Sequence, residues 1–185
     1  MPILQNNKSF QKFSVNTVAV INLSQGPNMK KILFSLLVLQ LFVACSDRLE
    51  TEITIHAPRQ KVWEIFADTA SYPGWNPMIL EFGGEMKQGE QIRVKLKQPG
   101  DDAMEFTPLV TEMIAGQVFE WQGKLLFDFL FSGRHRFEFV EISANKTLLK
   151  QSEQFSGILL PALNMENTRK GFELMNDALK KRAEK

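Results

Sequence analysis

The clearest hydrophobic pattern lies at the end of the chain, over residues 161–184. Phe172, Met175 and Leu179 recur at helical spacing and share one face, while charged residues fill the other. A helix of this length extends about 36 Å at about 1.5 Å per residue, which is too long for one strand to cover. The pattern therefore predicts a C-terminal helix packed across a whole sheet. Gly171, in mid-helix, marks either a close approach to the sheet or to a ligand, or a hinge.

The sheet is predicted from the middle of the chain, where apolar and polar residues alternate as they do in strands. A first strand is predicted over residues 49–56, and Pro58 suits the start of a short helix after it. Asp68 is expected to cap a second short turn or helix. The expected fold is α+β, with a curved sheet gripping the terminal helix. Turn residues separate six further predicted strands, at 80–86, 91–97, 103–113, 117–127, 133–142 and 147–155.

Charge and composition narrow the possible functions. The chain carries 22 Lys and Arg against 21 Asp and Glu, and the two signs are interspersed. This balance leaves no basic face, so we expect no nucleic-acid partner. The sequence has 15 Phe and 1 Tyr, which indicates a large, dry interior, because a phenyl ring has no polar group to satisfy.

Motifs for metal, cofactor or covalent chemistry are missing from the sequence. His56 and His135 lie far apart and Cys45 is the sole cysteine, so no cluster has metal-ligand spacing. There is no glycine-rich phosphate loop and no Gly-x-Ser-x-Gly motif. We therefore expect no metal and no cofactor. Any catalysis would shape a bound substrate and move protons.

Residues 29–44 have the pattern of a secretory signal. Met29-Lys30-Lys31 is followed by an uncharged run that ends at Cys45. The run is shorter than the roughly 20 residues that span a bilayer core, so a permanent membrane span is not expected. The segment resembles a bacterial lipoprotein signal peptide, in which a peptidase cuts before a cysteine that carries lipid. Phe42 stands where that family usually has Leu, and the alternative for Cys45 is a buried free thiol.

The resemblance to a lipoprotein signal sets the expected domain boundaries and location. Residues 1–28 are polar and aperiodic, so we interpret them as an upstream translation artefact or a disordered segment, with Met29 as the true start. Residues 45–48 would be the anchor cysteine and a short tether, and 49–185 the mature domain. The protein would be exported and held by lipid at an envelope membrane, on the periplasmic side in a Gram-negative cell.

The mature domain carries short motifs in a fixed order. They are Ile55-His56-Ala57-Pro58, Val62-Trp63, Tyr72-Pro73, Trp75-Asn76-Pro77, Phe119-x-Trp121-x-Gly123, Gly133-x-His135-x-Phe137, Glu153-x-Phe155-x-Gly157 and Met175-Asn176-x-Ala178-Leu179-Lys180. Together they resemble the SRPBCC (START-like) superfamily, and most of all its polyketide cyclase/dehydrase-like branch, over residues 49–184. The resemblance implies a helix-grip fold: a seven-stranded antiparallel sheet curled around the C-terminal helix, with a hydrophobic cavity between them. Its members include lipid carriers, hormone and sterol binders and aromatase/cyclases, so the resemblance does not fix one chemistry.

Strand alternation indicates which side chains face the expected cavity. Apolar walls with a few polar groups are typical of small-molecule pockets. The polar groups expected here are His135, Gln151 and Glu153. The predicted ligand-binding residues are Trp75, Phe106, Phe119, Trp121, Leu125, His135, Phe137, Phe139, Leu149, Gln151, Glu153, Phe172 and Met175.

Two roles are open for His135 and Glu153, the catalytic candidates. They could form a proton-transfer pair, since burial raises the pKa of a carboxyl group and a carboxylate partner raises that of histidine. The alternative, which is the commoner case for such residues, is a satisfied polar pair that orders the sheet.

The function that fits these features is binding, with carriage as a further step, of a hydrophobic or amphipathic small molecule at a membrane surface. The alternative is a cyclase- or dehydratase-type enzyme that uses acid and base residues in the same pocket. A third interpretation is an envelope interaction module without a ligand. Whether the protein is an enzyme, and its oligomeric state, stay open.

Overall fold

The computed structural model describes residues 46–185 of the chain. The upstream segment 1–28, the signal peptide predicted over 29–44 and the lipidation predicted at Cys45 lie outside the described residues and stay predictions. No helix in the described part is both long and apolar enough to cross a bilayer.

Residues 46–185 form strands, two α-helices and two short 3₁₀ helices, close to the predicted order. In sequence they are β1 (Ser46–Ile55), α2 (Arg59–Ala67), η1 (Thr69–Gly74), β2 (Ile79–Gly83), β3 (Arg93–Leu96), β4 (Met104–Phe106), β5 (Leu109–Ile114), β6 (Val118–Lys124), β7 (Ser132–Ser143), β8 (Lys146–Ser156), η2 (Leu160–Ala162) and α3 (Met165–Ala183).

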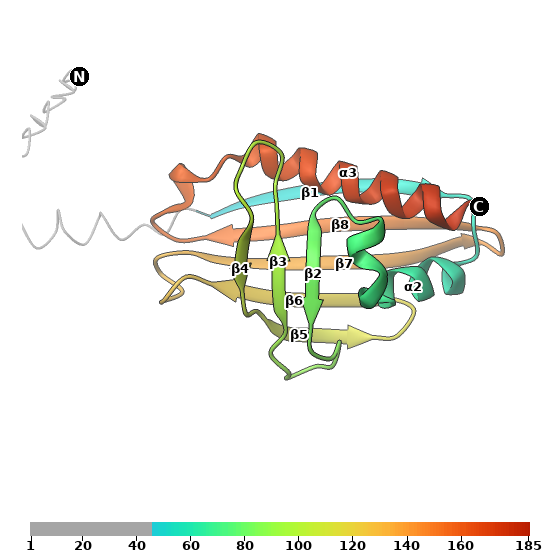
Figure 1. The fold of residues 1–185 in the computed structure, drawn as a ribbon, viewed down its shortest axis with the longest axis horizontal. Helices are drawn as coiled ribbons and strands as arrows, with labels where there is room; N and C mark the ends of the chain where they lie inside the picture. Colours follow the sequence, from blue (N-terminus) through green and yellow to red (C-terminus); the bar gives the residue numbers. More distant parts are fainter. Residues whose placement is uncertain (1–45) are drawn as a thin grey trace, which may run out of the picture. The chain divides into compact units, whose positions relative to one another are not determined.

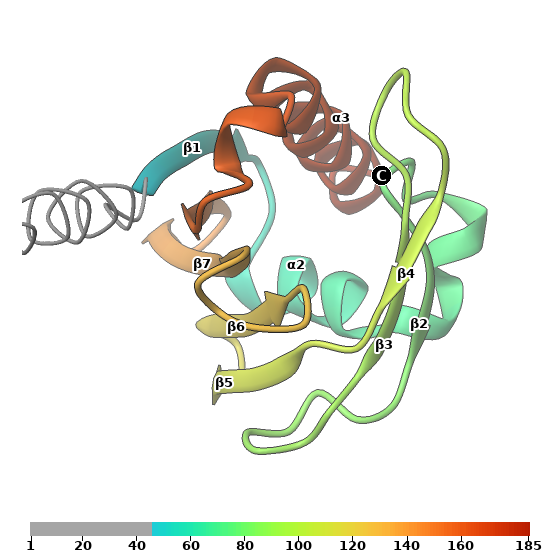
Figure 2. The ribbon, with the colours of Figure 1, turned by 90° about the vertical axis from the view of Figure 1, so that its left-hand side faces the viewer.

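The strands make two antiparallel sheets, one in the order β1-β8-β7-β6-β5 and the other in the order β2-β3-β4. Figure 1 shows α3 lying along β1, with the small sheet crossing over the large one. In Figure 2 the two sheets form an open arc, with α3 at its opening and α2 inside it. The expected helix-grip architecture is thereby confirmed.

The strand count differs from the prediction because the strand expected over residues 103–113 is broken. It divides into β4 and β5, which belong to different sheets. Pro108 lies at the break and has no N–H to donate to a strand ladder. Its carbonyl accepts from the Ile92 N–H at 3.0 Å, and Gln91 bridges to Leu109, so the chain passes from one sheet to the other here.

The terminal helix begins later than predicted. Pro161 lies in η2, and Asn164 is the N-cap of α3, with its side-chain oxygen accepting from the Asn167 N–H at 3.1 Å. An asparagine in this position satisfies an N–H that has no partner within the helix. The apolar period of residues 161–184 therefore predicted which face of the helix is buried. The cap at Asn164 determines the residue at which the helix begins.

An aromatic cluster fills the inside of the arc beneath α2. The Phe66 ring lies 4.8 Å from Phe137, 5.0 Å from Phe139 and 5.9 Å from Phe119, centroid to centroid. The Tyr72 hydroxyl donates to the Phe66 carbonyl at 2.6 Å, which fixes η1 against the end of α2. All five of these side chains are buried, so this part of the arc is solid core.

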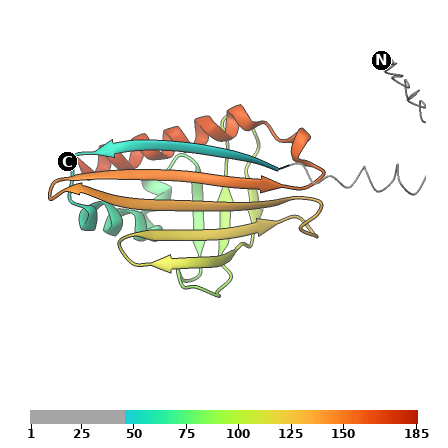
Figure 3. The same cartoon turned by 180° about the vertical axis from the view of Figure 1, so that it is seen from behind.

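The outer face of the large sheet is polar. Figure 3 shows this face, with both helices behind it. The Arg136 guanidinium contacts the carboxylates of Glu112, Glu120 and Glu138, which together raise its pKa. The apolar side of the sheet therefore faces inward, as strand alternation predicts.

Candidate functional site

A cavity of about 210 Å³ lies between the two sheets, beside the start of α3. It occupies the end of the arc that the aromatic cluster of α2 leaves open. Its few polar side chains include His135 and Glu153, which are neighbours across β7 and β8. Its apolar walls come from Met78, Leu96, Met104, Phe106, Trp121, Leu125, Phe131, Phe155, Leu163 and Phe172.

His135 is held between aromatic rings. Its imidazole stacks between Phe137 at 4.4 Å and Phe172 at 4.5 Å, and Trp121 lies edge-on at 5.1 Å. Its Nε2 lies 2.9 Å from the side-chain nitrogen of Gln151. Burial lowers the pKa of His135 to about 3, because an imidazolium loses its hydration there. The imidazole is therefore neutral at pH 7.

Glu153 is the acid of the cavity. Its side chain keeps 16% of its accessible surface, and burial raises its pKa to about 8. The carboxyl group is therefore mostly protonated at neutral pH. Gly133, on the neighbouring strand, makes room for it, since a Cβ at Gly133 would overlap Glu153 Oε1.

The separation between the two candidates decides how they act on each other. His135 Nδ1 lies 3.7 Å from Glu153 Oε2, longer than a hydrogen bond. A protonated carboxyl group carries no charge to stabilise an imidazolium, so the expected rise in the pKa of His135 does not occur. The Glu153 O–H is left to bond with whatever enters the cavity, such as a carbonyl or hydroxyl oxygen.

Metal chemistry has no candidate centre in the part of the chain that the structure describes. No three His, Asp or Glu side chains among residues 46–185 gather closely enough to hold an ion. The cavity offers a neutral acid and a neutral imidazole among mostly apolar walls, with Gln98, Glu105 and Lys124 as its other polar lining residues.

A family model described as polyketide cyclase/dehydrase and lipid transport matches residues 46–184 of this sequence. The chain belongs to this family. No curated protein matches the sequence significantly.

Solved structures share the fold at low identity. A START superfamily protein from Mycobacterium smegmatis is 19% identical with a TM-score of 0.59, over 74% of this chain and 97% of that chain. The Zhui aromatase/cyclase from Streptomyces sp. R1128 is 18% identical with a TM-score of 0.56, over 76% and 94%. A point mutant of norcoclaurine synthase from Thalictrum flavum, in complex with a transition-state analogue, is 14% identical with a TM-score of 0.57, over 76% and 95%. In each of these proteins the matched region makes up almost the whole solved chain.

The structure brings together six of the residues predicted to line the family cavity. They are Phe106, Trp121, Leu125, His135, Glu153 and Phe172. Leu125 lies just beyond the end of β6, at the mouth of the cavity, and not within a strand as predicted.

The other seven predicted residues lie outside the lining of this cavity, and their role in ligand binding stays a prediction. Strand alternation gives the face of a side chain but not whether the space in front of it is filled. Phe66 from α2 fills the space in front of Phe119, Phe137 and Phe139. Trp75 packs edge-on to Tyr72 at 5.2 Å. The residues concerned are Trp75, Phe119, Phe137, Phe139, Leu149, Gln151 and Met175.

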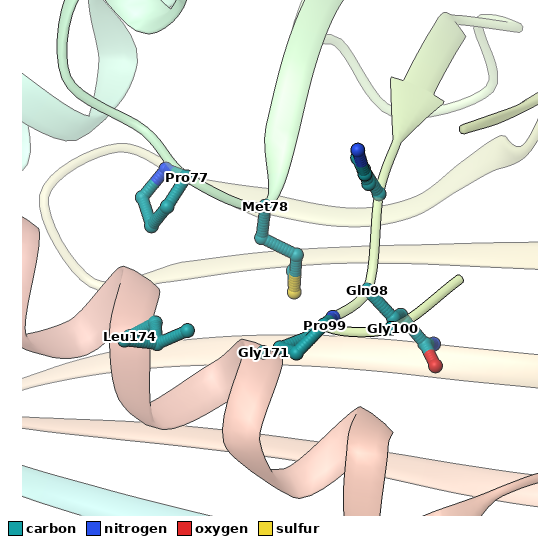
Figure 4. A pocket seen from close by; sticks show the side chains of 8 residues that line it. Pro77, Met78, Gln98, Pro99, Gly100, Gly171 and Leu174 are labelled. Carbon is teal, nitrogen blue, oxygen red and sulfur yellow. The ribbon is translucent and has the colours of Figure 1, made fainter. Parts of the chain in front are cut away.

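Several lining residues escaped the sequence analysis because they lie in loops or at strand ends. One of them, Met78, could have been expected from the glycine at position 171, which indicated a close approach to the helix. A Cβ at Gly171 would lie 3.3 Å from Met78 Sδ and 3.6 Å from Pro99 Cδ, so the glycine marks a close approach to α3. Met78, Pro99 and Gly171 line one side pocket of about 190 Å³, whose lining residues are shown in Figure 4. Met78 and Gln98 line both this pocket and the cavity, and so separate the two.

We expect Glu153→Gln to stabilise the protein more at high pH than at low pH. The pKa of Glu153 rises from 4.5 to about 8 on folding, so between these values the folded state keeps a proton that the unfolded state releases. The stability of the natural protein therefore falls across this window, by at most about 1.4 kcal/mol per pH unit. Glutamine does not titrate and escapes this loss.

The measurement is urea unfolding of both proteins at about pH 5 and about pH 9. The lowered pKa of His135 reduces stability as the pH falls below 6.5, but it acts on both proteins and cancels in the comparison. Glu50→Gln, on the exposed side of β1, is the control and should change stability equally at both pH values. An advantage of Glu153→Gln that does not grow with pH would contradict the assignment.

Proposed function

We propose that this protein binds a small, mostly apolar molecule in its cavity, with a polar oxygen of the ligand against the protonated Glu153. The observation that carries the proposal is a protonated acid, Glu153, set in mostly apolar walls beside a neutral imidazole. Such walls supply affinity by the burial of apolar surface, and the acid orients the ligand. Membership of a family of hydrophobic-ligand binders and cyclases supports the same reading.

The size of the cavity limits the ligand. An apolar protein cavity of about 150 Å³ accepts benzene, while drug-sized ligands occupy about 300–1,000 Å³. A cavity of about 210 Å³ therefore suits one ring or a short branched chain. A sterol or a long polyketide would need the cavity to widen.

The proposed location is the surface of an envelope membrane. It is supported by the signal pattern of residues 29–44 and by the cysteine that follows it. Two or three acyl chains, at about 0.8 kcal/mol per buried CH₂, hold a domain to a bilayer for long periods. A carrier of apolar molecules would there be close to the phase in which they dissolve.

The test uses a protein that begins at Ser46, so that no lipid anchor can be mistaken for a ligand. Native mass spectrometry with solvent extraction should find a discrete apolar species, and ¹⁹F NMR should show 4-fluorophenol binding. Leu163→Trp places extra volume against the cavity and should weaken 4-fluorophenol binding at least about tenfold. Val140→Trp, a somewhat larger enlargement on the exposed outer face, should leave it unchanged. Equal binding by both variants would place the ligand elsewhere, and no binding by any of them would favour an interaction module.

A cyclase- or dehydratase-type enzyme is the second candidate. The observation that favours it is the protonated Glu153, which can serve as a general acid in the pocket beside His135. Glu153→Gln separates the two functions. It keeps a polar group of the same shape, so a carrier should still bind its ligand, whereas an enzyme should bind but no longer turn over.

A further inference from the structure

Two neighbouring loops carry large apolar side chains into solvent at one end of the domain. The loop between β6 and β7, residues 125–131, contains one charged residue, Asp128, and the segment 157–163 after β8 contains none. Leu126 is 76% exposed, Phe127 61% and Phe129 53%. We name these two segments the apolar loop pair; its exposed members are Leu125, Leu126, Phe127, Phe129, Ile158 and Leu159.

The apolar loop pair is one continuous surface. The N–H groups of Ile158 and Leu159 donate to the carbonyls of Phe129 and Leu130, each at 3.0 Å. The rings of Phe127 and Phe129 stack at 5.6 Å with an interplanar angle of 9°. In Figure 2 both connections face the viewer at the same end of the arc. These exposed side chains are therefore presented together.

The first described residue of the chain lies at the same end. Ser46 pairs with Ser156 at the end of β8, and Ser132 at the start of β7 pairs with the same residue. Ser46 directly follows Cys45, the predicted lipid carrier. A lipid on Cys45 would therefore place the bilayer next to the apolar loop pair.

The mouth of the cavity also opens at this end. Lys124, the last residue of β6, and Leu125 and Phe131 of the β6–β7 loop line the cavity. The one acidic side chain of the loop, Asp128, lies 3.6 Å from the ammonium of Lys124, so its charge is paired. An apolar surface whose one charge is paired suits the boundary between lipid headgroups and acyl chains. A surface that binds another protein usually has a rim of polar residues around its apolar centre.

We infer that the apolar loop pair inserts into the lipid surface and turns the mouth of the cavity toward the bilayer. The inference rests on the proposed function, because it supplies the route by which an apolar ligand reaches the cavity without crossing water. Phe and Leu at the tips of loops bury well in the boundary between headgroups and acyl chains. The lipid anchor holds the domain at the membrane, and the loop pair sets its orientation.

The experiment is flotation of the protein starting at Ser46 with phosphatidylcholine vesicles, so that the anchor is absent and the bilayer carries no net charge. The test variant combines Leu126→Glu, Phe127→Glu and Phe129→Glu. The control combines Ile114→Glu, Val140→Glu and Ile142→Glu, which are exposed apolar residues of β5 and β7 outside the loop pair. The natural sequence and the control should partition to vesicles at least about tenfold more than the test variant.

Two outcomes would overturn the inference. One is a test variant that floats as well as the natural sequence, or a natural sequence that does not float at all. The other is a dimer of the natural sequence in sedimentation that the test variant loses without any vesicle binding, which would make the surface an interface between copies. Binding of 4-fluorophenol without vesicles reports on the cavity alone. If the natural protein does not bind 4-fluorophenol, the proposed function is contradicted. The vesicle result still tests the membrane inference by itself.

Discussion

Replacing Phe66 with alanine should lower the free energy of unfolding by about 3–5 kcal/mol, the range found for buried phenylalanines. Phe66 is 1% exposed and packs against the rings of Phe119, Phe137 and Phe139. These rings stand on two strands of a rigid sheet and cannot close over the missing ring. The loss therefore combines the transfer of the phenyl group to water with an unfilled space.

Urea unfolding measures this change, and Phe129→Ala is its matched control. Phe129 also has an aromatic neighbour, Phe127, but it is 53% exposed and should cost less than about 1 kcal/mol. A loss of stability below about 1.5 kcal/mol for Phe66→Ala would mean that Phe66 does not hold α2 tightly against β6 and β7.

Replacing Gly157 with alanine should lower stability by about 3 kcal/mol or more, through backbone strain and a steric clash. Gly157 has φ of +121°, which residues with a Cβ rarely adopt. A Cβ there would lie 2.5 Å from the Leu130 carbonyl oxygen and 2.8 Å from Phe131 Cα, both in the backbone. Relief would require the two loops of the apolar loop pair to move apart.

Gly89→Ala is the control, since Gly89 also has a positive φ but a Cβ there would cause no steric clash. Its φ is +86°, but a Cβ there would meet no atom within 4 Å. It should therefore cost about 1 kcal/mol, from the backbone conformation alone. Urea unfolding of both variants gives the difference. Equal losses would show that the approach of Gly157 to Leu130 is not tight, and vesicle flotation of Gly157→Ala would then be unchanged.

The fold followed closely from sequence patterns because those patterns are local. The alternation of residues 147–155 and the helical period of 161–184 each depend only on backbone geometry, and both elements are present. The break at Pro108 also has a local cause, the missing N–H, but its result was not local. It moved β4 and β5 into different sheets, which depends on the pairing of β4 with β3.

The candidate site was predictable in its chemistry and less so in its extent. The alternation of residues along two strands was enough to predict that His135 and Glu153 face inward. Their pairing across β7 and β8 places them together. Their charge states depend on how deeply they are buried. A buried acid next to a charged imidazole would titrate differently from one next to a neutral imidazole, and no sequence period distinguishes the two.

By itself the sequence determined most of the strands, the gripping helix and the inward face of the sheet, since periodicity and turn residues act over a few neighbours. Its short motifs, and not its periodicity, indicated the family. Only the tertiary structure decided the size of the cavity, because Phe66 reaches the rings of β6 and β7 from a helix more than fifty residues away in the chain. It alone joined residues 125–131 to 157–163 in one apolar surface beside Ser46. Such outcomes depend on packing between distant segments, which a local pattern does not record.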